Sequence, residues 1–230
     1  MNSISKNKKY KILVVLSTVI LTFVVIFSVV NLLRIFLPQH FFNGFVPAVY
    51  SKGISENVKK AQGIEIPEFI DKQIIGIHST ARTGVHLTDI NNIVVHYVGN
   101  PGTTAKNNRD YFNKITTGVS SHFIVGLDGE IIQCLPLWEK SAASNNRNSD
   151  TISIEVCHLD ESGKFNEDTY SSLVKLCVWL CYEFNLNENG IIRHYDITGK
   201  NCPKFYVENP NAWDKFIQDV KVNLDGYEKY

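Results

Sequence analysis

The sequence has no excess of charge of either sign. Lysine plus arginine and aspartate plus glutamate each number 23, so the formal net charge is zero. The first 33 positions hold four lysines and no acidic residue, which leaves the rest of the chain with a net charge of −4. Proteins that bind nucleic acid usually present a basic face that neutralises phosphates. We therefore expect no nucleic-acid partner.

Cysteine is also sparse, because the 230 residues include only five, an odd number. A secreted domain held together by disulfides usually has more cysteines, and an even number of them. With five cysteines, at least one must remain outside any disulfide within the chain. Cys177 and Cys181 lie one helical turn apart in an apolar stripe, and we expect them to be buried rather than a redox or metal pair. Cys202 differs, because it lies in the polar run RHYDITGKNCPKFY (193–206), whose composition favours turns rather than a helix.

Charged residues are absent from Ile12 to Leu33, a stretch of 22 residues. About 20 apolar residues cross the hydrocarbon core of a bilayer, whereas the apolar part of a cleaved signal peptide is about 7 to 15 residues long. We expect an uncleaved anchor; cleavage near residues 46–48 is the alternative. Lysines precede the stretch and only Arg34 follows closely, so the positive-inside rule predicts a cytoplasmic N-terminus and an external remainder.

The chain divides into five predicted parts. These are a cytoplasmic basic tail (1–11), a transmembrane anchor (12–33), a stalk and lead-in segment without a sustained hydrophobic period (34–89), one globular domain (90–222) and a C-terminal tail (223–230).

Strands and helices alternate in the predicted domain. The apolar patterns indicate strands at 93–98 and 151–156, two strands joined around Asp128-Gly129, a short strand at 191–192, and helices over 104–115, 168–184 and about 213–220. Asn166 is a candidate N-cap for the second helix. This order predicts a single α/β domain with a central mixed β-sheet flanked by helices, preceded by an N-terminal transmembrane helix.

Three residues need a common explanation because their side chains can bind a metal. His96 lies at the end of a buried strand, His194 lies at the end of another strand, and Cys202 lies in the polar run that follows. Catalytic zinc takes three such protein ligands and keeps a fourth position open. By spacing alone two alternatives remain. His96 could be a hydrogen-bonded core histidine beside an inert thiol, or Cys202 could be a nucleophile activated by His194.

Four segments, in order along the chain, carry a more specific signal: VVHY (94–97), SHFIVGLDGEIIQ (121–133), TISIEV (151–156) and RHYDITGKNCPK (193–204). Together they resemble zinc-dependent N-acetylmuramoyl-L-alanine amidases, the family that includes phage lysozyme-like amidases and peptidoglycan recognition proteins. The resemblance covers about residues 90 to 222. It implies a mixed sheet flanked by helices, with a groove for the glycan peptide over the zinc.

The resemblance also implies roles for individual residues. His96, His194 and Cys202 match the zinc ligands. Glu155 matches a glutamate that acts as general base and then general acid, and Lys200 matches a basic residue that stabilises the oxyanion. Some members carry a catalytic Tyr where this chain has Ser121, which places the proton transfer on Glu155.

Two further residues are candidates for substrate binding. His122 lies in a strand beside the site and would bind substrate or orient water, although a structural histidine is equally consistent with the sequence. Asn146 belongs to the polar loop SNNRNSD (144–150), which is a candidate for lining the groove.

Together, the uncharged stretch and the resemblance predict a membrane-anchored, extracytoplasmic zinc amidase of a bacterial envelope. Its substrate would be peptidoglycan, cut between N-acetylmuramic acid and L-alanine. A non-catalytic peptidoglycan-binding module and a Cys-His peptidase are the alternatives. The sequence gives no indication of the oligomeric state.

Overall fold

The computed structural model describes residues 17–22, 24–26, 29, 53–77 and 81–227. The chain forms two compact units, Met1–Lys52 and Gly53–Tyr230. In the first unit, residues 17–22 and 24–26 are helical. Much of the predicted anchor at 12–33 lies outside the described residues. Within the residues that are described, no helix has both the length and the apolar character needed to cross a membrane.

The second unit is built on a six-stranded sheet in the order β1-β4-β3-β5-β2-β6. The strands are β1 (Ile70–Lys72), β2 (Asn92–Val95), β3 (Phe123–Val125), β4 (Ile131–Gln133), β5 (Thr151–Val156) and β6 (Ile191–Arg193). Only the β3–β4 pair is antiparallel, and the other neighbours run parallel. The predicted mixed sheet is therefore confirmed.

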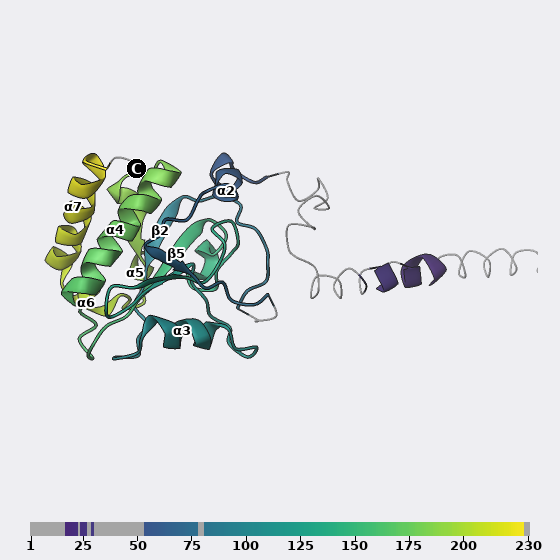
Figure 1. Ribbon diagram of the computed structural model, residues 1–230, viewed down its shortest axis with the longest axis horizontal. Helices are drawn as coiled ribbons and strands as arrows, with labels where there is room; N and C mark the ends of the chain where they lie inside the picture. The colour runs from purple at the N-terminus through teal and green to yellow at the C-terminus, as the bar shows by residue number, and fades with distance from the viewer. Residues whose placement is uncertain (1–16, 23, 27–28, 30–52, 78–80, 228–230) are drawn as a thin grey trace, which may run out of the picture. The chain divides into compact units, whose positions relative to one another are not determined.

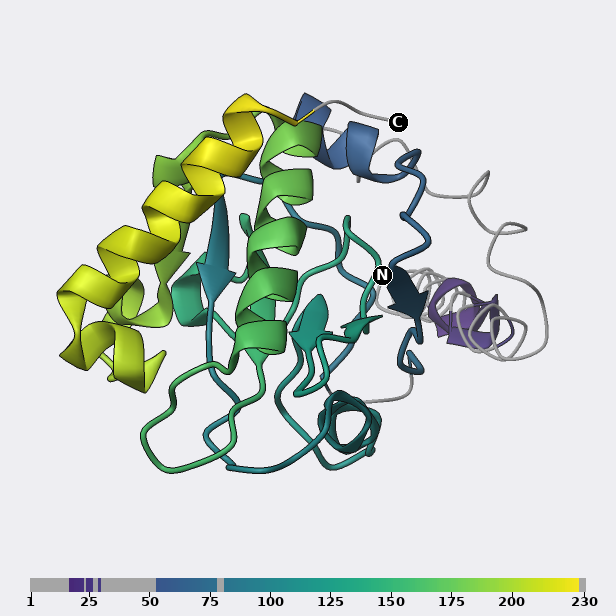
Figure 2. The same cartoon turned by 60° about the vertical axis from the view of Figure 1, so that its left-hand side comes forward.

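The helices of the second unit are α2 (Glu56–Ala61), α3 (Ala105–Phe112), α4 (Glu167–Phe184), α5 (His194–Thr198), α6 (Lys204–Glu208) and α7 (Pro210–Asp225), with 3-10 turns η2 (Asn145–Arg147) and η3 (Glu188–Gly190). The long helices α4 and α7 lie side by side against the sheet, whereas α3 lies apart from them (Figures 1 and 2). The predicted flanking helices are confirmed.

The two faces of the sheet differ in character. Ile93 and Val95 of β2 and Ile154 of β5 belong to the larger apolar cluster, which also includes α4 and α7. A smaller cluster on the opposite face joins α3 to β3 and β4. Because side chains alternate along a strand, Ser153 and Glu155 of β5 point away from α4. This second face has room for polar side chains.

The β3–β4 hairpin closes through residues 126–130, where Gly126 N donates to Glu130 O at 2.8 Å. Gly129 has φ +78°, the left-handed region that glycine tolerates best. A Cβ on Gly129 would also lie 3.2 Å from the backbone oxygen of Asp168 at the start of α4. Glycine is thus required both by the turn and by its packing on the helix.

Helix α4 follows the apolar stripe predicted for 168–184. The side chain of Asn166 accepts a hydrogen bond from Thr169 N at 2.9 Å, which confirms the predicted N-cap. Cys177 and Cys181 are fully buried in the apolar core, as expected. All five cysteines lie in the described part of the chain, and none of them forms a disulfide.

Residues 53–77 and 81–89 pack with the second unit rather than forming a separate lead-in. Val58 of α2 and Ile70 of β1 contribute to the larger apolar cluster. The unit begins at Gly53, well before the boundary near residue 90 that the sequence suggested. Its first helix has six residues and its first strand three. Elements this short do not display a hydrophobic period.

The prediction that residues 193–206 form turns rather than a helix is wrong, because α5 lies within this run and α6 begins in it. Asp196 accepts a hydrogen bond from Arg193 N at 2.8 Å, which caps the start of α5. Gly199 ends it in the left-handed conformation, with φ +75°. Local capping therefore outweighs the turn-forming composition.

Candidate metal and catalytic site

The three predicted ligands converge at one edge of the sheet. His96 directly follows β2, and its backbone N–H donates to Ile154 O at 2.8 Å. His194 directly follows β6, which pairs in parallel with β2. The connection after α5 then returns to this edge, because Tyr195 N donates to Cys202 O at 2.9 Å. Parallel pairing and one tight helical turn thus bring distant residues together.

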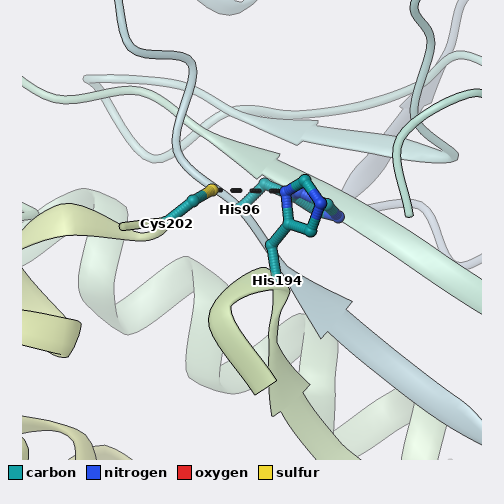
Figure 3. A group of neighbouring side chains, drawn as sticks. All are labelled: His96, His194 and Cys202. Carbon is teal, nitrogen blue, oxygen red and sulfur yellow. Dashed lines mark hydrogen bonds between the residues drawn. The ribbon is translucent and has the colours of Figure 1, made fainter. Parts of the chain in front are cut away.

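The donor atoms of His96, His194 and Cys202 all lie within 4.8 Å of one another. His96 Nδ1 and Cys202 Sγ are 3.9 Å apart, and the two imidazole centroids are separated by 4.6 Å (Figure 3). All three residues are buried. Two imidazoles and one thiol are a ligand set that suits zinc and leaves a fourth position for water or substrate.

The hydrogen bonds of the imidazoles show which nitrogen is available to a metal. His96 Nε2 lies 3.3 Å from Ser144 Oγ, and His194 Nε2 lies 2.8 Å from Asn145 Oδ1. Among the described residues, no hydrogen-bond partner is within reach of the buried Nδ1 of His194. Both Nδ1 atoms are therefore the ones that fit a metal, together with the Cys202 sulfur.

Burial sets the protonation of the ligand residues. It lowers the pKa of His96 well below its usual value, and the charges of His194 and Lys200 add to this. Burial, followed by Lys200, also lowers the pKa of His194. Neutral imidazoles, which are the ligating form, are thus favoured.

The Cys202 thiol is held in its protonated form in the metal-free protein. Burial and then the Glu155 carboxylate raise its pKa to about 12. The Tyr97 backbone N–H and the Lys200 ammonium act in the opposite direction. A cation at the site would supply the charge that favours the thiolate.

Glu155 lies on β5, on the sheet face that points away from α4. Burial raises its pKa to about 8, and the Lys200 ammonium partly opposes this rise. Within the described residues its buried Oε2 has no hydrogen-bond partner. A carboxyl with a pKa near neutrality can both take up and release a proton.

Lys200 lies on the exposed connection between α5 and Cys202. Its positive charge lowers the pKa of each of four groups: His96, His194, Glu155 and Cys202. The ammonium therefore acts electrostatically on all the predicted ligands and on the predicted general base. The structure thus brings the three predicted ligands together, and the charges of Glu155 and Lys200 act on residues of this group.

Comparison with known proteins identifies the family in which this set of residues occurs. Residues 86–205, about half of the chain, match the family described as N-acetylmuramoyl-L-alanine amidase. The chain is a member of this amidase family. It is 33% identical over 173 residues to the N-acetylmuramoyl-L-alanine amidase BlyA of Bacillus subtilis (strain 168), covering 66% of this chain and 47% of BlyA.

Other relatives lead to the same family. The amidase CwlL of Bacillus licheniformis is 29% identical over 166 residues, covering 65% of this chain and 46% of CwlL. The chain therefore spans about half the length of these curated relatives. Among solved structures, the catalytic domain of XlyA is similar with a TM-score of 0.58 and 26% identity, covering 66% of this chain and 98% of that domain.

A mutant endolysin from Bacillus subtilis is also similar in structure, with a TM-score of 0.57 and 26% identity over 66% of this chain and 97% of that one. The amidase-family domain thus has the fold that the sequence resemblance implied.

His122 of the amidase-family domain is a buried side chain with both ring nitrogens occupied. Its Nδ1 accepts from Ser153 N at 3.0 Å, and its Nε2 lies 2.8 Å from the backbone oxygen of Glu139. Burial lowers its pKa to about 4. This arrangement favours the structural alternative over the predicted substrate contact.

Asn146 is exposed on η2, next to the residue that contacts His194. Its predicted contact with substrate stays a prediction. The adjacent side chains of Ser144 and Asn145 contact the Nε2 atoms of His96 and His194. The sequence did not suggest this role. The polar loop 144–150 was a visible signal, but nothing in it indicates which of its residues faces the histidines.

Proposed function

We propose that this chain is a zinc-dependent N-acetylmuramoyl-L-alanine amidase that hydrolyses the amide bond between N-acetylmuramic acid and L-alanine in bacterial peptidoglycan. The observation that carries the proposal is the buried group of His96, His194 and Cys202 within a domain of the amidase family. The amidase names of BlyA and CwlL support the choice of substrate.

In this proposal His96 Nδ1, His194 Nδ1 and Cys202 Sγ hold the zinc. When bound, zinc supplies a Lewis acid that polarises the amide carbonyl and makes water more acidic. The surrounding protein contributes neutral imidazoles and a buried, water-poor setting. In such a setting charge interactions are stronger than in bulk water.

Glu155 is the general base and then the general acid. Its carboxylate takes a proton from the attacking water, and the resulting carboxylic acid passes that proton to the departing amine nitrogen of L-alanine. A pKa near 8 suits both transfers, because the protonated form predominates at neutral pH while a fraction of the carboxylate stays available as the base.

Lys200 stabilises the negative charge that develops on the amide carbonyl oxygen during the attack. Its charge already acts on Glu155 and on all three ligand residues, which supports its place beside the reacting atoms. A donor aimed at developing charge accelerates the chemical step more than it strengthens substrate binding.

The two alternatives are less well supported. A Cys-His peptidase requires an accessible nucleophile, whereas Cys202 is only 2% exposed. A non-catalytic peptidoglycan-binding module does not need two histidines and a cysteine with converging donor atoms. A buried carboxyl with a raised pKa beside them also suits catalysis better than binding alone.

We further propose that the domain works outside the cytoplasm, attached to the membrane through residues 12–33. The support is the sequence alone: 22 residues without charge, preceded by four lysines.

The test of the enzymatic proposal combines metal analysis with product identification. We expect about one zinc ion per purified chain, and release of peptides that begin with L-alanine from purified peptidoglycan, detected by mass spectrometry. Chelation should stop the release and added zinc should restore it. Peptidoglycan binding without cleavage would favour the binding module, and cleavage that withstands complete metal removal would favour the peptidase.

A further inference from the structure

Two adjacent side chains of one loop contact the Nε2 atoms of the two candidate ligand histidines, His96 and His194. Ser144 Oγ lies 3.3 Å from His96 Nε2, and Asn145 Oδ1 lies 2.8 Å from His194 Nε2. The contacts bridge 48 and 49 positions of sequence. On the opposite side of each ring, His96 Nδ1 lies 3.9 Å from the Cys202 sulfur, and the buried His194 Nδ1 has no hydrogen-bond partner among the described residues.

We propose that Ser144 and Asn145 are positioning residues that keep the proton of each imidazole on Nε2, so that both Nδ1 lone pairs face the metal. This inference rests on the metal centre of the proposed function. Ligand histidines in metal sites commonly donate their second ring N–H to an oxygen, which fixes both the tautomer and the ring orientation. Here a single loop supplies both acceptors.

The chemistry of His194 supports this tautomer. The side-chain oxygen of Asn145 only accepts hydrogen bonds, so the facing His194 Nε2 must be the donor. The other tautomer would place a proton on a buried Nδ1 that has no acceptor among the described residues. An unsatisfied buried donor costs about 1–3 kcal/mol. The same contact that satisfies Nε2 therefore leaves Nδ1 free to bind a cation.

The loop itself is held firmly. Asn148 Oδ1 accepts hydrogen bonds from the backbone N–H groups of Ala143 and Ser144, at 3.0 and 2.6 Å. Arg147 Nη2 donates to Asn92 Oδ1 at 2.6 Å, which ties η2 to the start of β2. The two acceptors are thus fixed relative to β2, the strand that directly precedes His96.

The backbone of Asn145 also points to a specific role. Its φ of 53° is in the left-handed region, where asparagine is one of the few non-glycine residues found regularly. An alanine there would combine loss of the side chain with backbone strain. Asn145→Gly removes the side chain without that strain, and Asn145→Asp keeps an oxygen acceptor in place. This pair separates the hydrogen bond from the fold of the loop.

Loss of the Ser144 contact should weaken zinc binding more than loss of the Asn145 contact, because Ser144 is buried and Asn145 is exposed to solvent. Ser144 and His96 are both buried, so Ser144→Ala leaves the His96 Nε2 proton without a partner. Asn145 is exposed, so water can take its place beside His194. Loss of such partners typically weakens metal binding 10- to 100-fold. We expect Ser144→Ala to approach 100-fold and Asn145→Gly to approach 10-fold.

The first experiment measures zinc affinity of the full chain by competition with a chromophoric chelator. We expect weaker binding for Ser144→Ala and Asn145→Gly, and near wild-type affinity for Asn145→Asp and for the neighbouring control Asn146→Gly. Equal losses in Asn145→Gly and Asn146→Gly would overturn the proposal, because the effect would then belong to the loop backbone. Wild-type affinity in both Ser144→Ala and Asn145→Gly would also overturn it.

The second experiment needs no variant, metal or substrate. Long-range proton–nitrogen NMR correlation on the metal-free, wild-type chain reports which nitrogen of each imidazole carries the proton. We expect the Nε2–H form for both His96 and His194, and a proton on Nδ1 of either would refute the inference. Because this readout does not depend on catalysis, failure of the amidase proposal and failure of the tautomer proposal are told apart.

Discussion

Arg82 and Glu139 form a buried, two-pronged ion pair. Nε and Nη2 of Arg82 each lie 2.7 Å from a carboxylate oxygen of Glu139, and the side chains are only 4% and 6% exposed. The remaining Nη1 donates to Ile75 O at 2.7 Å. The pair fastens the segment before β2 to the chain between β4 and β5, which continues to Ser144 and Asn145.

Replacing Arg82 by methionine should destabilise the domain by about 3–5 kcal/mol, because it leaves a buried carboxylate without its partner. Urea unfolding measures this change. The double variant Arg82→Met/Glu139→Leu should be more stable than Arg82→Met alone, since it removes the unpaired charge. A cost below about 1 kcal/mol for Arg82→Met would show that water reaches the carboxylate.

Cys202→Ser should lose zinc and activity together, because a serine hydroxyl is a poor ligand where a thiolate binds strongly. Metal analysis and turnover on the same preparation test this. Cys181→Ala is the matched control, since Cys181 is buried in the apolar core and outside the ligand group. A fully metallated and active Cys202→Ser variant would remove Cys202 from the ligand set.

Lys200→Ala should retain zinc and bind a muramoyl peptide while turnover falls about 100- to 1000-fold, the usual effect of removing one oxyanion donor. Zinc content, binding and kcat are measured on one defined substrate. Lys221→Ala, on the distant helix α7, should keep wild-type turnover. Near-normal turnover in Lys200→Ala would show that Lys200 is a solvent-exposed loop residue without a catalytic role.

Glu155 should make the stability of the metal-free protein depend on pH. Its pKa is about 8 in the folded state, against an ordinary value of 4.5. Between these values the folded state holds the extra proton, so stability falls as pH rises, by up to about 1.4 kcal/mol per pH unit, and levels off above pH 8.

Glu155→Gln removes this titration. Compared with the wild-type protein in urea unfolding, the variant should gain more stability at pH 8 than at pH 5, while losing amidase activity at both. Parallel pH profiles for the two proteins would mean that Glu155 ionises normally.

The full-length chain should partition with membranes, with residues after Arg34 accessible from outside, because of the length of the uncharged stretch and its lysine-rich flank. Cell fractionation and protease accessibility test this together. A soluble form beginning near Tyr50 as the main product would instead indicate a cleaved signal peptide.

The sequence alone predicted the elements whose patterns are local and long. The β-branched run around Val94 and Val95 is strand β2, which pairs with β5 and β6, and the apolar stripe with its Asn166 cap is α4. The three candidate ligand residues were predicted because their segments resemble those of a known family in the same order along the chain. Each of these signals is contained in a stretch of neighbouring residues.

What the sequence did not reveal depends on contacts between distant positions. Residues 53–77 and 81–89 pack as part of the domain, and one of their contacts, the Arg82–Glu139 ion pair, joins residues 57 positions apart. Ser144 and Asn145 resemble any polar loop residues until the fold places them against the histidines. The short helix α5 forms because Asp196 and Gly199 cap its two ends, which composition alone does not express.

The convergence of His96 and Cys202 has a thermodynamic consequence for the whole domain. The two residues are 106 positions apart, so an ion shared by them acts as a reversible cross-link across nearly half of the chain. Because the ion binds the folded state, free zinc at 100 times its dissociation constant adds about 2.7 kcal/mol to the free energy of unfolding. The supply of zinc would then control not only turnover but also how long the domain withstands unfolding and proteolysis.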